Sequence, residues 1–315
     1  MSKSNSSKKN SKSPKQKIDP TIVVALIGVV GTIIAALFAS PTLITLIQRT
    51  PATMPTITET PTPPTTLTPL TPVATLTNLQ SSTHTTFSQC PPDMALVPAG
   101  VFRMGATSND KDAQDDERPQ QEIYLDAFCI QKIEISNQMY FEFLGKTLPS
   151  NTISNLPVVN ISWHEASAYC EGKGYSLPTE AQWEKAARGE NDFIYPWGNR
   201  WDAKRANYGE TQPRGLRPVT DYSDGASPYG ILNMAGNAAE WVADWYADDW
   251  YDKMPESNPF KSIQPTGIEA TRVVRGGSFV DSKELLRTSR RDGTNFPDDK
   301  FDFLGFRCAA RPLSP

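Results

Sequence analysis

Pro157-Val-Val-Asn-Ile-Ser-Trp163 and Leu177-Pro-Thr-Glu-Ala-Gln-Trp-Glu-Lys-Ala-Ala-Arg-Gly189 carry the strongest fold signals of this 315-residue chain. At the end of the first stretch and within the second, a hydroxyl residue is followed three positions later by Glu or Gln, which is the pattern of a helix capping box. The two boxes, Ser162 with Glu165 and Thr179 with Gln182, precede predicted helices over 163–171 and 180–188. Two consecutive helices therefore organise this part of the chain.

Short strands are predicted on the N-terminal side of these helices. Apolar runs broken by proline and glycine over 94–105 predict a strand, a turn and a second strand, and 121–130 predicts one further strand. Ser136 is the expected N-cap of another helix. Beyond Gly189 the chain is rich in Gly, Pro, Asn, Asp and aromatic residues, which predicts short strands joined by long ordered loops.

Two further strings mark the C-terminal part, Arg275-Gly-Gly-Ser278 and Gly305-Phe-Arg-Cys308. Together with 157–189 they resemble the sulfatase-modifying factor, or formylglycine-generating enzyme, family over about residues 93–312. The resemblance implies an α+β fold related to C-type lectins, with little regular secondary structure. It also implies a copper-dependent oxidase that converts a sulfatase cysteine to formylglycine.

The positions of the family's two catalytic thiols are not cysteines in this chain. The first lies three residues after the serine of the Gly-Gly-Ser string and the second five residues further on, where this sequence has Asp281 and Leu286. The resemblance places Ser278 beside the oxygen-binding pocket, and Ala239 stands where the family usually has tryptophan. Ser278, Asp281 and Leu286 are therefore pocket positions, and no catalytic residue or copper site is assigned.

The resemblance also implies calcium, bound by Asn233, Gly236, Ala238 and Glu240. The side chains of Asn233 and Glu240 and the carbonyls of Gly236 and Ala238 are hard oxygen donors of the kind that calcium prefers. The alternative is a plain turn with Glu240 solvated or in a salt bridge. A second family calcium site would begin at Asn207 and Tyr208, but the segment that follows is shortened.

The four cysteines, Cys90, Cys129, Cys170 and Cys308, allow two disulfides in three pairings that spacing cannot distinguish. The resemblance implies a bridge between Cys170 and Cys308, which leaves Cys90 with Cys129. With only two histidines, His84 and His164, one chain cannot build a three-histidine iron site. We expect His164 on a helix surface.

The N-terminal quarter predicts an anchor followed by a spacer. Residues 1–20 form a basic cytoplasmic tail, and the uncharged apolar run within 21–40 is long enough for a transmembrane helix. A cleaved signal peptide and a buried core helix are the alternatives. The Thr/Pro-rich segment 41–89 is a predicted disordered linker, and residues 90–315 form the extracytoplasmic domain.

The chain carries a net charge of −4, and the lysine-rich tail makes the remainder more acidic still. An acidic exported domain argues against nucleic acid as a partner. We expect a monomer that is tethered through one helix and takes a peptide or protein ligand.

Three functions remain open at the level of sequence. The favoured one is a membrane-anchored binding or accessory module without cysteine-oxidase activity. The second is an enzyme, either a formylglycine-generating oxidase with relocated ligands or another oxidoreductase in the same pocket. The third is a variable lectin-like ligand-binding protein of the kind that retroelements diversify, which a template copy of residues 275–308 beside the gene would distinguish.

Overall fold

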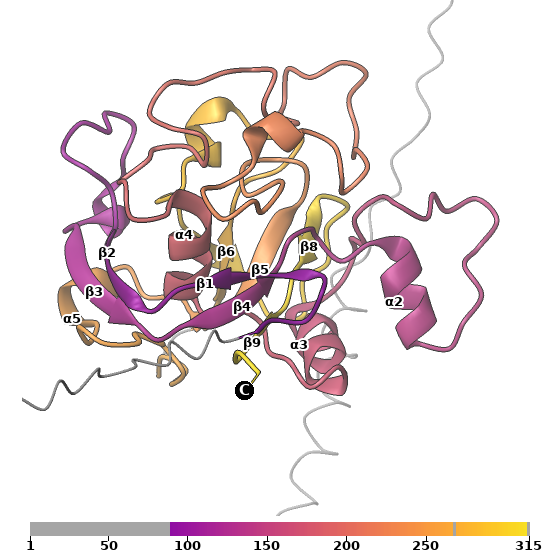
Figure 1. Ribbon diagram of the computed structural model, residues 1–315, viewed down its shortest axis with the longest axis horizontal. Coiled ribbons are helices and arrows are strands. Elements are labelled where there is room, and N and C mark those ends of the chain that lie inside the picture. The colour runs from indigo at the N-terminus through magenta and orange to yellow at the C-terminus, as the bar shows by residue number, and fades with distance from the viewer. Residues whose placement is uncertain (1–88, 267–268, 314–315) are drawn as a thin grey trace, which may run out of the picture. The chain divides into compact units, whose positions relative to one another are not determined.

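Short strands and helices separated by long loops make up the part of the chain that the computed structural model describes, residues 89–266 and 269–313 (Figure 1). The predicted tail, the predicted transmembrane helix and all but the last residue of the predicted linker lie outside these residues. Among the described residues, no helix is both long enough and apolar enough to cross a bilayer.

Three sheets form the β part of the described chain. A three-stranded sheet has the order β1-β4-β9, a two-stranded sheet pairs β2 with β3, and a four-stranded sheet has the order β7-β6-β5-β8. Among the strand pairs of the described residues, only β5–β8 is parallel. The strands are β1 (Met94–Val97), β2 (Gly100–Met104), β3 (Gln121–Leu125), β4 (Phe128–Gln131), β5 (Ala239–Trp245), β6 (Arg272–Arg275), β7 (Asp292–Asn295), β8 (Leu304–Phe306) and β9 (Ala309–Ala310).

The single strand predicted over 121–130 is wrong, because the segment forms β3 and β4 in two different sheets. The strand pairing is interrupted at Asp126, whose backbone N–H donates to Asn258 Oδ1 at 2.9 Å instead of to a neighbouring strand. Beyond the break, β4 pairs with β1 and β9. The pairing partners are distant in sequence, so the local pattern does not reveal the division.

The predicted helix starts are confirmed. Ser136 caps α2 (Asn137–Phe143) by accepting from the Met139 N–H, and both capping boxes form with the expected partners. They begin α3 (Trp163–Gly172) and α4 (Glu180–Arg188). A short α5 (Trp250–Lys253) and three 3-10 turns, η1 (Asp115–Glu117), η2 (Ser223–Gly225) and η3 (Lys283–Leu286), complete the helical elements described.

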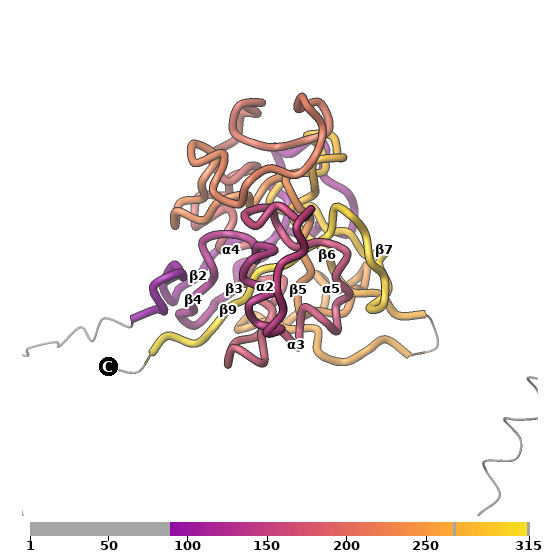
Figure 2. Tube along the Cα trace, turned by 90° about the vertical axis from the view of Figure 1, so that its right-hand side faces the viewer, coloured from indigo at the N-terminus to yellow at the C-terminus, as the bar shows by residue number. Residues whose placement is uncertain are grey.

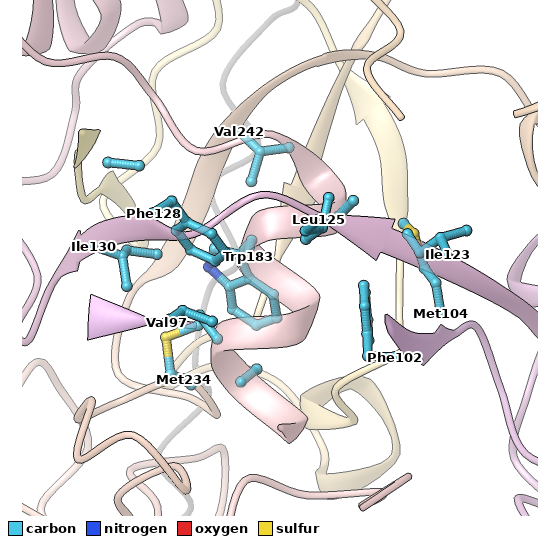
Figure 3. Close-up of a cluster of buried hydrophobic side chains, with 14 of the residues drawn as sticks. Val97, Phe102, Met104, Ile123, Leu125, Phe128, Ile130, Trp183, Met234 and Val242 are labelled. Atoms are coloured by element: carbon cyan, nitrogen blue, oxygen red, sulfur yellow. The ribbon is translucent and has the colours of Figure 1, made fainter. Parts of the chain in front are cut away.

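Helix α4 lies at the centre of the main core. Its Trp183 is fully buried and is surrounded by apolar side chains from β1, β4 and β5 and by Met234 (Figure 3). The indole Nε1–H also donates to Glu240 Oε2 at 2.9 Å, so the ring is held by a polar contact as well as by packing. A second cluster joins α2 and α3 to β8 around Tyr169 and Phe306.

Both disulfide predictions are confirmed. Cys90 is bonded to Cys129, and Cys170 to Cys308. The second bridge ties α3 to the segment between β8 and β9 across 138 residues. Figure 2 shows the loops near residues 200–235 gathered at one end of the domain, away from α3. The predicted division into short elements and long ordered loops is therefore confirmed for the described part.

Candidate functional site

The turn after β6 depends on two glycines. Gly276 and Gly277 have φ angles of +88° and +62°, a region that glycine occupies without strain. A Cβ at Gly277 would lie 2.8 Å from the carbonyl oxygen of Leu285, which is too close for any other residue without rearrangement. This turn sets the position of Ser278 and of the residues that follow it.

Asp281 closes this turn. Its Oδ2 accepts hydrogen bonds from the backbone N–H and from the hydroxyl of Ser278, both at 2.8 Å. The two pocket residues predicted around the first thiol position are therefore brought together. Their mutual contact is local and leaves Oδ1 of Asp281 without a hydrogen bond from the described residues.

Leu286, at the second thiol position, is fully buried in an apolar cluster with Tyr208 and Ala235. Its methyl groups lie about 3 Å from where a Cβ would stand on Gly236 and Gly277. The leucine thus fills the space between two glycine turns. Its side chain offers no atom that could ligate a metal or transfer a proton.

All four cysteines of the chain are in disulfides. Copper(I) prefers soft sulfur ligands, and disulfide sulfurs are not thiolates. The residues present therefore do not fit the copper site that the family resemblance implies.

A cavity of about 140 Å³ adjoins Asp281. Its polar wall includes the charged residues Asp281, Arg290 and Asp292, while Val274, Ala239 and Phe303 supply apolar surface. Ala239 is at the wall where the family usually has tryptophan. The lining residues are Ala239, Val274, Arg275, Gly276, Gly277, Asp281, Leu285, Arg290, Asp292, Asn295 and Phe303.

Buried ion pairs hold the frame of this cavity. Arg275 donates to Glu180 Oε1 at 3.0 Å and to Glu184 Oε2 at 2.6 Å, so the last residue of β6 is joined to α4. It also donates to the carbonyls of Thr288 and Ser289. The start of the glycine turn is consequently anchored from both sides.

Three of the four arginines at positions 287, 290, 291 and 307 pair with acids. Their pairs are Arg287 with Asp110 and Glu117, Arg291 with Glu180, and Arg307 with Glu240. Arg290, the fourth, has no acidic partner within 4.0 Å among the described residues and instead lines the cavity.

The predicted calcium residues lie together on the loop that precedes β5 and, for Glu240, at the start of β5 itself. Arg307 donates to both oxygens of Glu240 at 2.7 Å, and Trp183 donates to Oε2 as well. Glu240 can therefore offer a cation one remaining lone pair on Oε1 unless it exchanges Arg307 for the ion. The amide nitrogen of Asn233 donates to Glu134. Calcium at Asn233, Gly236, Ala238 and Glu240 stays a prediction.

Glu134 is a buried acid that sequence reasoning did not connect with this loop. It accepts hydrogen bonds from the side chains of Asn233 and Asn237 and from the Ala238 N–H. Burial, and to a lesser degree the neighbouring charge of Glu240, raise the pKa of Glu134 to about 8, against the opposing charge of Arg307. No local pattern around Glu134 signals contacts with residues about 100 positions away.

The start of the second family calcium site also holds an unsatisfied group. Asn207 is buried, and its Nδ2 donates to Asn237 Oδ1 and to the Gly215 carbonyl, whereas its Oδ1 has no hydrogen-bond partner among the described residues. No group of three or more His, Cys, Asp or Glu suited to a metal is found in the described chain. His164 lies on the surface of α3, where its imidazole is 3.9 Å from Asp298, as expected.

The fold and site together define a loop-rich mixed α/β domain that carries a small polar cavity beside a glycine turn. The chain belongs to the sulfatase-modifying factor enzyme 1-like domain family, which residues 80–312 match.

A relative named as a formylglycine-generating enzyme and one named as an inactive form are both similar to this chain. The formylglycine-generating enzyme of Thermomonospora curvata is 31% identical over 289 residues, covering 70% of this chain and 94% of that protein. The inactive C-alpha-formylglycine-generating enzyme 2 of Mus musculus is 29% identical, covering 71% and 87%. PvdO from Pseudomonas aeruginosa has a similar structure, with a TM-score of 0.60 at 22% identity over 69% of this chain and 94% of that one.

Proposed function

We propose that this protein is a membrane-anchored, extracytoplasmic domain of the family that binds a ligand or assists another protein and does not generate formylglycine. The observation that carries the proposal is the replacement of both family thiols. Asp281 closes its own turn, Leu286 is buried in apolar contacts, and every cysteine is already in a disulfide. The chain therefore has no thiolate with which to hold copper(I).

The location has separate support. The basic residues before the apolar run of 21–40 favour a cytoplasmic N-terminus under the positive-inside rule. Two disulfides suit an oxidising compartment, where such bonds persist. In this proposal the Thr/Pro-rich segment 41–89 holds the domain away from the membrane.

The decisive assay is incubation of the purified chain with copper(I), oxygen and a peptide containing Cys-x-Pro-x-Arg, followed by mass spectrometry. The Thermomonospora curvata enzyme, run in parallel, is the positive control. We expect the peptide cysteine to remain unchanged with this protein. A loss of mass at that cysteine, at a rate that scales with protein concentration, would overturn the proposal.

A matched variant tests the reason for inactivity. The double substitution D281C/L286C places thiols at both family positions while leaving the buried ion pairs in place. We expect the double variant to retain copper(I) in competition with a chelator, whereas the parent chain does not. Equal copper retention by the two proteins would contradict the assignment of these two positions as the missing ligands.

A further inference from the structure

Two buried donors at the Asp281 cavity have no hydrogen-bond partner among the described residues. They are Nδ2 of Asn295, which is 6% exposed, and Nε of Arg275, which is 1% exposed. Both residues line the cavity. Buried donors in folded proteins are nearly always paired, and an unpaired one is destabilising. A ligand in the cavity that carries an acceptor, such as a carboxylate, would satisfy the Asn295 amide.

The charged groups of the cavity also have hydrogen-bonding and ion-pairing capacity that no described residue satisfies. Asp281 accepts through Oδ2, and Asp292 accepts from Thr294 through Oδ1, so one oxygen of each accepts nothing from the described residues. Arg290 donates to the carbonyl of Arg291 and lies in no ion pair of the described chain. Because Arg275 is already neutralised by Glu180 and Glu184, two carboxylates face one free guanidinium.

The space limits the ligand. A cavity of about 140 Å³ is below the roughly 300 Å³ at which pockets for drug-sized ligands begin. Arg290 and Asp292 also line a neighbouring open cleft that contains Asp115, Asp116 and Asp248. A small molecule in the cavity could thus extend a positively charged arm along Asp292 into this acidic cleft.

We propose, building on the binding role above, that this cavity binds a free cationic amino acid such as lysine or ornithine. The ligand carboxylate meets Asn295 and Arg290, and its α-amine meets the free oxygen of Asp281. The second amine follows Asp292 toward the acidic cleft. The ligand thereby supplies the acceptor that the Asn295 amide lacks and the positive charge that the two carboxylates require.

Isothermal titration calorimetry on the full chain tests the proposal with L-lysine and three partial analogues. We expect lysine to bind at least about tenfold more tightly than pentane-1,5-diamine, hexanoate or L-glutamate, because each analogue leaves a buried or charged group unpaired. No heat with lysine up to about 10 mM, or equal affinity for lysine and glutamate, overturns the proposal.

Variants separate ligand contacts from structural ones. Asn295→Leu removes an unsatisfied donor, so its melting temperature without ligand should equal or exceed that of the parent while lysine affinity falls at least about tenfold. Asp292→Asn keeps the acceptor used by Thr294 and should also weaken lysine, whereas exposed Asp221→Asn is the charge-matched control and should not. Unchanged lysine affinity in Asn295→Leu contradicts the assignment.

Failure of the amino-acid proposal can be distinguished from failure of the proposed non-oxidase function. A chain that ignores lysine and leaves the peptide cysteine unchanged overturns only the amino-acid proposal. Oxidation of the peptide cysteine overturns the non-oxidase function, whichever way the lysine titration ends.

Discussion

Replacing Arg287 by methionine should be among the most destabilising single changes in the described domain. Its guanidinium is buried and donates to both oxygens of Glu117 at 2.6 Å and to Asp110 at 2.7 Å. Methionine has similar bulk but leaves two buried carboxylates without a cation. Breaking a buried pair in this way costs about 3–5 kcal/mol, which is a large part of the 5–15 kcal/mol typical of a folded domain.

The ion pair of Arg287 with Glu117 also predicts how the stability difference between parent and variant changes with pH. Burial alone would raise the pKa of Glu117, but the hydrogen bonds and charge of Arg287 lower it below its ordinary 4.5. In the parent chain the stability that Glu117 contributes is present above the pKa of Glu117 in the unfolded chain. It is lost as the pH falls through the lower pKa that Glu117 has in the folded chain. In Arg287→Met the carboxylates gain from protonation, so the variant should lose less stability on acidification.

Urea unfolding followed by circular dichroism measures both effects. Lys300→Met is the control, because its ion pair with Glu165 is exposed and should be worth no more than about 1 kcal/mol. The double variant E117Q/R287M should be more stable than R287M alone by about 1 kcal/mol or more. If R287M loses no more stability than K300M, our account of the buried pair is wrong.

Three further outcomes are expected. Burial, more than the neighbouring charge of Glu180, raises the pKa of Asp244 to about 7. The contribution of Asp244 to stability is therefore full below about pH 4 and falls as the pH rises to 7. Thermal melts should show that the melting temperature of Asp244→Asn depends less on pH over this range than that of the parent. Replacing Cys170 and Cys308 by alanine should cost about 2–5 kcal/mol in urea unfolding under oxidising conditions, because the bridge closes a long loop. If calcium binds, EGTA should lower the melting temperature of the parent but not that of Glu240→Gln. Because Glu240→Gln also weakens the contact with Arg307, the melting temperatures with and without EGTA are compared within each protein.

Local signals in the sequence were sufficient for α2, α3 and α4, but not for the short α5. The capping boxes of α3 and α4 involve residues three positions apart, so their hydrogen bonds can be predicted without knowing the rest of the fold. The strands were harder, because the division of 121–130 depends on partners in β1, β2 and β9. Pairing of Cys170 with Cys308 came from the family resemblance, since spacing allowed three arrangements.

The candidate site was predictable to a similar degree. Sequence named Ser278, Asp281 and Leu286 as pocket positions. Of these, Asp281 is among the residues that line the cavity in the described chain, while Ser278 and Leu286 lie against the adjoining glycine turn. Sequence did not predict Asn295, which reaches the cavity only because β7 pairs antiparallel with β6 and sets Asn295 opposite Arg272. Nothing in the local sequence distinguishes an asparagine with an unpaired amide from one exposed on a loop.

The frame of the site and its chemistry depend on different residues. Arg275, Glu180 and Glu184 fix the glycine turn through buried ion pairs, and none of these contacts involves position 281 or 286. Among the described residues, Asp281 bonds only to its own turn and to Gly209, while Leu286 makes apolar contacts. Loss of the thiols therefore removes the copper ligands without removing what holds the cavity open. With alanine at position 239, that cavity keeps free carboxylates and an unpaired donor on Asn295, which are the features on which the proposed binding role rests.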